Sequence, residues 1–225
     1  MVLKFFKAQD SERLERIEAK IQQMLEYDRK EFDLAMSALL GDATAAGVND
    51  ELRSTDRRVN ELEREIRREL LVHASVFGGI DTPAVLVYMS IVKDIERIGD
   101  YAKNLVDLAL DGSNFGGLPD SEEWRRLQAD ISRYIADCGR AFRTRDPDTS
   151  RKLLSHGDGL LDVFDDGVSA LVSGSDTNPQ AVARALAHRY LKRVVAHLMN
   201  VLSSVVMPLD KLDYFDEDPE DRARH

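Results

Sequence analysis

Apolar side chains recur every three or four residues in six long segments of this chain. The clearest run is the first, whose apolar positions are Leu14, Ile17, Ile21, Met24, Phe32, Ala35 and Leu39. Such spacing places the apolar residues on one face of a helix. The pattern therefore predicts six amphipathic helices, at about residues 14–39, 49–77, 83–105, 121–143, 148–172 and 180–206.

Clusters of Gly, Pro, Ser and Asn separate these segments. The richest cluster is DGSNFGGLPDS at residues 111–121, in the middle of the chain. Pro83 suits the first turn of the third helix, where a missing N–H costs nothing. No segment alternates apolar and polar residues for long enough to predict a strand, so the fold class is all-α.

The six predicted helices form two sets of three that align with each other. An offset of 102 residues places Asp56, Val59, Asn60, Leu62 and Ile66 over Asp158, Leu161, Asp162, Phe164 and Val168. An offset of 96 residues likewise places the third helix over the sixth. We therefore expect two tandem three-helix bundles, at residues 9–111 and 121–212, and an acidic tail at residues 213–225.

Composition narrows the classes of function. The 225 residues include 31 Lys and Arg against 41 Asp and Glu, giving a net charge of -10, so direct nucleic-acid binding is not expected. The single cysteine, Cys138, can form neither an internal disulfide nor a CxxC zinc pattern. No apolar stretch approaches the ~18 residues of a membrane span. The N-terminus resembles no signal peptide, so we expect a cytoplasmic protein.

The candidate chemistry lies in KDIERIGDYAKNL, at residues 93–105, where Glu96 and Asp100 are four positions apart. On a helix they form a ridge opposite the apolar stripe, which predicts that they face outward. Carboxylates from adjacent helices can bind a divalent cation, although the solvated face of any amphipathic helix has the same pattern. No nucleophile motif, phosphate loop or HExxH pattern accompanies the acids, so an enzyme is not expected.

Two segments resemble acidic motifs of the PhoU family of phosphate-signalling regulators. DIERIGDYAKNL at residues 94–105 is similar to the family's third-helix motif, and DRRVNELEREI at residues 56–66 is similar to its second-helix motif. The resemblance covers about residues 10–212. It implies a cytoplasmic six-helix regulator of phosphate uptake and phosphate-starvation signalling. The expected partners are a phosphate ABC transporter and a sensor histidine kinase, and the protein would be peripheral to the membrane through these partners.

Several alternatives stay open beside this one. The chain could be an accessory subunit of a sodium- or proton-coupled phosphate carrier, or a metal-binding helical protein with carboxylate-based chemistry. A homodimer is also open. Arg97 and Arg193, at equivalent positions, are candidate partner contacts, or they cover neighbouring side chains with their stems. Asn104 and Asn200 are expected to hydrogen-bond between helices.

The resemblance also implies candidate metal ligands, because some PhoU proteins hold metal ions on the bundle surface through Glu/AspXXXAsp motifs. The candidate ligands of a divalent or iron-type ion are Glu96, Asp100, Asp56, Asn60, Asp158 and Asp162. The sequence departs from the family pattern at three positions, because Asn60, Lys192 and Ala196 replace acids. Lys192 could pair with Asp158 or Asp162, so any metal site is expected in the first bundle.

Overall fold

The computed structural model describes residues 11–77, 81–176 and 179–212, and the predicted acidic tail lies outside this range. The described residues contain helices and no strand, which confirms the predicted all-α class. The elements are α1 (Ser11–Leu39), α2 (Ala45–Phe77), α3 (Thr82–Leu110), η3 (Phe115–Gly117), α4 (Ser121–Thr144), α5 (Pro147–Ser173), α6 (Ala181–Val206) and η4 (Leu209–Lys211).

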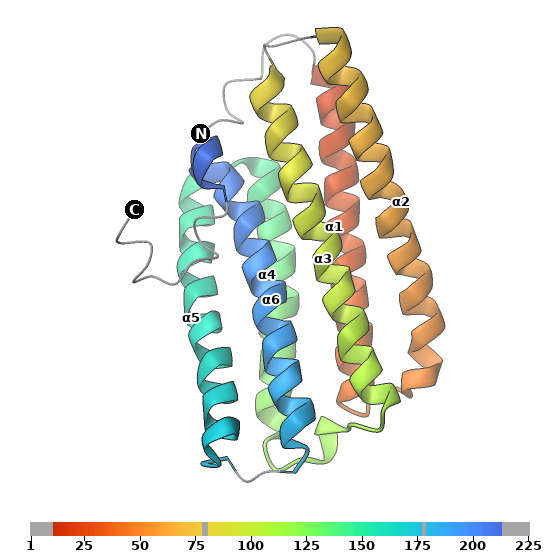
Figure 1. Cartoon of the computed structure of the whole chain (residues 1–225), viewed down its shortest axis with the longest axis vertical. Helices are drawn as coiled ribbons and strands as arrows, with labels where there is room; N and C mark the ends of the chain where they lie inside the picture. Colours follow the sequence, from red (N-terminus) through yellow and green to blue (C-terminus); the bar gives the residue numbers. More distant parts are fainter. Residues whose placement is uncertain (1–10, 78–80, 177–178, 213–225) are drawn as a thin grey trace.

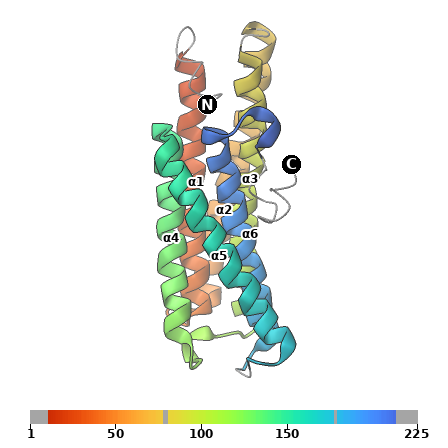
Figure 2. The same ribbon diagram turned by 90° about the vertical axis from the view of Figure 1, so that its left-hand side faces the viewer.

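The helices form two three-helix bundles that lie side by side along the long axis of the molecule (Figure 1). In the first bundle α1, α2 and α3 pack against one another, and in the second α4, α5 and α6 do the same. The bundles meet where α3 packs against α6 and where α1 packs against α4. Figure 2 shows α5 running obliquely across the second bundle. The two tandem bundles predicted from the internal repeat are therefore present.

The predicted apolar stripes form the core. In α1, Ile17, Ile21, Met24 and Phe32 have no exposed surface. The buried apolar residues of both bundles belong to one continuous cluster, so the bundles share a core and do not fold around two separate ones. Because α1 and α3 are covered on more than one side, their buried faces are wider than the stripe of a simple surface helix.

The connection between the bundles depends on a close backbone approach. After α3 the chain turns through η3, where Gly116 lies against the end of α1. A Cβ atom at this position would be 1.8 Å from the carbonyl oxygen of Leu40, a distance that no side chain can accommodate. Gly116 therefore lets the connection pass directly over α1 and fixes where the second bundle begins.

Among the described residues, no helix combines the length and apolar character that a bilayer crossing requires.

Candidate functional site

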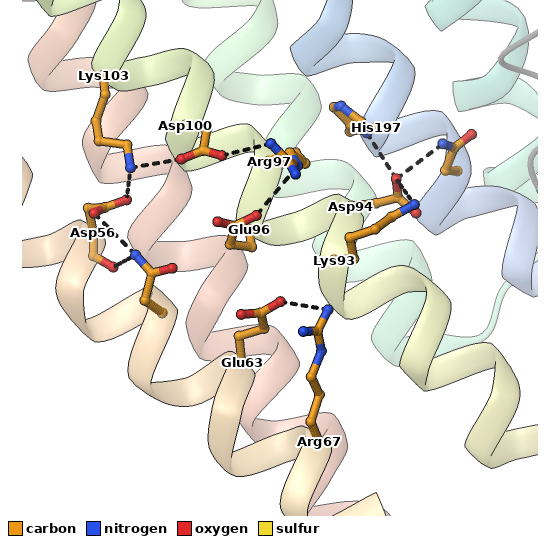
Figure 3. A network of polar contacts seen from close by, with 12 residues as sticks. Asp56, Glu63, Arg67, Lys93, Asp94, Glu96, Arg97, Asp100, Lys103 and His197 are labelled. Atoms are coloured by element: carbon orange, nitrogen blue, oxygen red, sulfur yellow. Dashed lines mark hydrogen bonds and ion pairs between the residues drawn. The ribbon is translucent and has the colours of Figure 1, made fainter.

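The acids predicted on α2 and α3 come together in the first bundle. Figure 3 shows Asp56 of α2 across from Asp100 and Glu96 of α3. Lys103, one turn after Asp100 on α3, lies between them. Its Nζ atom is 2.7 Å from Asp56 Oδ1 and 2.7 Å from Asp100 Oδ1. We use the name acidic cluster for Asp56, Glu96, Asp100 and Lys103 together with two acids of α1, Asp28 and Glu31.

The ammonium of Lys103 is held firmly in its charged form. Burial acts to lower the pKa of Lys103, but its hydrogen bonds to Asp100 and Asp56 outweigh that effect and raise the pKa above its ordinary value. Asn60 also turns toward Asp56, because its Nδ2 atom donates to the Asp56 backbone oxygen at 3.0 Å and to Oδ2 at 3.2 Å. Asp56 is therefore surrounded by donors from both α2 and α3.

Glu96 and Asp100, which were predicted to face outward, are only partly exposed. The exposed fractions of their side chains are 19% and 29%, against 54% for Arg97 between them. The reason is that α3 packs against α1, α2 and α6, so that the side opposite its apolar stripe is also partly covered. Burial, reinforced by the charge of Asp100, raises the pKa of Glu96.

Two further acids, which the sequence analysis did not select, lie beneath this pair. Asp28 and Glu31 of α1 have no exposed surface, and none of their four carboxylate oxygens has a hydrogen-bond partner. They lie against Gly99 of α3, where a Cβ atom would be 2.9 Å from Glu31 Oε2 and 3.3 Å from Asp28 Oδ1. A glycine at position 99 therefore leaves the room that the two carboxyl groups occupy.

Burial favours the neutral form of both acids. Burial, with the nearby charge of Asp56, raises the pKa of Glu31 to about 8. Burial and the charge of Glu31 raise the pKa of Asp28 well above its usual range. A signal for Asp28 was present in the sequence, because it occupies the core-facing position between Met24 and Phe32, at a spacing of four from each.

A metal ion does not fit the acidic cluster as it is arranged. Carboxylates from three helices converge there, but no three Asp, Glu, His or Cys side chains in the described part of the chain lie close enough together to share an ion. The ammonium of Lys103 supplies positive charge between Asp56 and Asp100, where a bridging cation would have to lie. Of the acids predicted as ligands, Asp56 and Asp100 therefore meet around a lysine.

The second bundle differs from the first at the equivalent positions. Asp158 is half-buried and Asp162 is exposed on α5. The expectation that Lys192 pairs with one of these two is wrong, because its Nζ atom pairs with Asp165. The antiparallel packing of α5 against α6 brings Lys192 to the level of Asp165, three residues beyond Asp162. Arg189 also approaches Asp165, at 3.5 Å.

The two candidate partner arginines are not equivalent. Arg97 is exposed and lies over the acidic cluster, with Nη1 3.3 Å from Asp100 Oδ2 and Nε 3.7 Å from Glu96 Oε2. Arg193 is half-buried on α6. Arg97 therefore presents a more exposed guanidinium than Arg193 does, and it lies at the acidic cluster.

A polar contact joins the two bundles beside the acidic cluster (Figure 3). Asp94 of α3 is almost completely buried, and its Oδ1 atom is 2.9 Å from His197 Nδ1 of α6. Asn200 Nδ2 donates to the same oxygen at 3.3 Å, which confirms the predicted interhelical hydrogen bond of Asn200. The ring of Tyr101 stacks on His197 at a centroid distance of 5.8 Å. Sequence periodicity gave no sign of this pairing, because its members are about one hundred residues apart.

Comparison with known proteins matches the first bundle to a protein family. The PhoU domain matches residues 21–109. A "Phosphate-specific transport system accessory protein PhoU homolog" of Pseudomonas aeruginosa is 24% identical over 184 residues, which are 79% of this chain and 75% of the relative. The homologue of that name in Synechocystis sp. is 23% identical over 197 residues, which are 85% of this chain and 87% of the relative.

A shorter match and a solved structure extend the comparison. "PhoU homolog 1" of Thermotoga maritima is 40% identical over 52 residues, which are 23% of this chain and 22% of the relative. The crystal structure of PhoU from Pseudomonas aeruginosa superposes with a TM-score of 0.76 at 22% identity, covering 86% of this chain and 95% of the other. That structure has the same fold.

Proposed function

Because this chain is a PhoU-domain protein with the two-bundle fold of PhoU, we propose that it regulates phosphate uptake and phosphate-starvation signalling from the cytoplasm. The observation that supports the proposal is the PhoU domain match at residues 21–109, the part of the chain that holds the acidic cluster. The relatives that align over most of the chain are named accessory proteins of phosphate-specific transport. The proposed role is regulatory and not catalytic.

The proposed mechanism is contact with a membrane-bound partner, either a component of a phosphate ABC transporter or a sensor histidine kinase. The surface proposed for the contact is the exposed Arg97 with Glu96 and Asp100 beside it. Arg97 pairs with Glu96 and Asp100, and both of these ion pairs are partly solvated. The guanidinium can therefore leave them and pair with an acid of a partner at little cost in free energy. The protein would be peripheral to the membrane only through such a partner.

Deletion of the gene tests the proposal. We expect the deletion strain to take up more phosphate and to express a phosphate-starvation reporter in phosphate-rich medium, and we expect the wild-type gene to restore repression. Arg97→Ala should restore it less well. Arg151→Ala is the matched control, because Arg151 is an exposed arginine that pairs with an acid three residues before it. Unchanged uptake and reporter expression in the deletion strain would refute the proposed function, as would affinity capture without any transporter or kinase component.

A further inference from the structure

Three arginines line a groove at the end of the first bundle that is upper in Figure 1. The groove lies between the first turns of α1 and the last turns of α2 and has a volume of about 480 Å³. Its lining residues are Arg13, Arg16, Glu65, Arg68, Glu69 and Val72. Arg68 is twelve residues beyond Asp56 on α2, which places the groove about 18 Å from the acidic cluster at a rise of 1.5 Å per residue.

Both acids of the groove pair with the same lysine. Lys20 Nζ is 2.7 Å from Glu65 Oε2 and 2.7 Å from Glu69 Oε1. The hydrogen bonds to Glu65 and Glu69 outweigh the opposing effect of burial and raise the pKa of Lys20, so this lysine stays charged. The hydrogen bond from Lys20 and, to a smaller extent, the charge of Arg68 lower the pKa of Glu65, while Glu69 Oε2 is buried without a hydrogen-bond partner.

The three guanidinium groups have no carboxylate partner in the described part of the chain. Among the side chains that the structure describes, no Asp or Glu oxygen lies within 4.0 Å of Arg13, Arg16 or Arg68. One terminal nitrogen of Arg13 is also buried without any hydrogen-bond acceptor. A buried charged donor without an acceptor costs free energy, which an incoming anion would recover.

The charge and shape of the groove indicate the class of anion. Four cations and two carboxylates give it a net charge of +2, although the whole chain carries -10. Planar guanidinium groups donate paired hydrogen bonds that match the oxygens of a phosphoryl group. A phosphate or phosphate ester carries a charge of about -1.5 to -2 at pH 7. A single carboxylate would neutralise only half of the charge of the groove.

We propose that the groove lined by Arg13, Arg16 and Arg68 binds the phosphoryl dianion of a small molecule, either inorganic phosphate or a phosphate monoester. The arginines supply the hydrogen bonds, Lys20 keeps Glu65 and Glu69 from competing for them, and the volume of the groove leaves room for a substituent on the phosphate. This site is independent of the partner contact at Arg97.

Equilibrium dialysis at low salt tests the proposal, with inorganic phosphate and adenosine 5′-monophosphate as separate probes. We expect saturable binding of at least one probe to the full chain. Arg13→Gln and Arg68→Gln should each weaken it about tenfold, the loss of one charge-assisted hydrogen-bonding group. Arg126→Gln, which changes an exposed arginine of α4 by the same charge, should leave the affinity within about twofold. Circular dichroism checks that each variant is folded.

The two probes separate the sources of the phosphoryl group. Tighter binding of inorganic phosphate assigns the groove to the free anion, and tighter binding of the monophosphate assigns it to an ester. Absence of saturable binding by either probe would overturn the proposal. Equal losses of affinity in Arg126→Gln and Arg68→Gln would also overturn it, because binding would then depend only on the total charge of the chain.

Discussion

At the scale of single residues, the acidic cluster contains an acid, Glu31, whose pKa is strongly raised. Its carboxyl group is buried against Gly99 without a hydrogen-bond partner. Burial raises its pKa from 4.5 to about 8. The folded chain therefore holds a proton on Glu31 at pH values where the unfolded chain has released it.

This shift predicts how stability depends on pH. The contribution of Glu31 is fully present below pH 4.5 and is lost as the pH rises to about 8, because the unfolded state binds fewer protons in that window. The loss is roughly 4 kcal/mol. We expect Glu31→Gln, which cannot ionise, to remove this part of the slope and to be more stable than the wild type at pH 8, as measured by urea unfolding between pH 5 and pH 8.

The control for Glu31 lies on the same helix. Glu26 is exposed on α1, so Glu26→Gln should leave the pH dependence of unfolding unchanged. If Glu31→Gln showed the full wild-type slope, the buried carboxyl group would not be the group that titrates.

At the scale of the helices, Lys103 joins α2 to α3. Its ammonium bridges Asp56 and Asp100, whose side chains are 14% and 29% exposed. The equivalent helices of the second bundle are joined differently, through Lys192 and Asp165. The two halves of the repeat therefore keep the same helix packing with different charge pairs.

Lys103→Met tests this pairing. The change keeps the length of the side chain but leaves two partly buried carboxylates facing each other, so we expect a loss of about 1–3 kcal/mol of unfolding free energy at pH 7. We also expect Mn²⁺ to raise the melting temperature of Lys103→Met and not that of the wild type, because the space between the carboxylates becomes open to a cation.

Lys30→Met is the matched control for that experiment. Lys30 Nζ also joins two helices, at 2.7 Å from Glu51 Oε1, but both side chains are about half exposed. Such a surface pair contributes about 0–1 kcal/mol. Equal losses in the two variants would show that the position of Lys103 in the acidic cluster has no special weight.

At the scale of the whole molecule, the contact between Asp94 and His197 links the two bundles. It is buried in the interface of α3 and α6, inside the core that the bundles share. Removing one member of a buried hydrogen-bonded pair costs about 1–3 kcal/mol, because the other member is left without a partner. Loss of this contact should therefore weaken the joint between the bundles more than either bundle alone.

We expect His197→Ala to lower the unfolding free energy by about 1–3 kcal/mol and to increase hydrogen exchange along α3 and α6. His156→Ala is the comparison, since His156 pairs with Asp130 at 3.3 Å on the surface, with a side chain 45% exposed. It should cost under about 1 kcal/mol. A similar cost for both variants, without a change in exchange at the interface, would contradict a coupling role for His197.

Much of the fold follows from the sequence alone. The three- and four-residue spacing of apolar positions determined six helices, and the repeat determined their grouping into two bundles, because amphipathic periodicity is a local property of the chain. The same periodicity put Glu96 and Asp100 on one ridge of α3. It could not decide how much of that ridge is covered, since covering depends on helices from elsewhere in the sequence.

The tertiary structure alone decided what surrounds those two acids. Asp28 and Glu31 reach them because α1 crosses α3 at Gly99, Lys103 takes the space between Asp56 and Asp100, and Asp94 meets His197 across the bundle interface. Each of these contacts is set by the register and crossing of helices that are distant in the chain. Spacing within one helix carries no information about that register, so the acids could be found in the sequence but their charge balance could not.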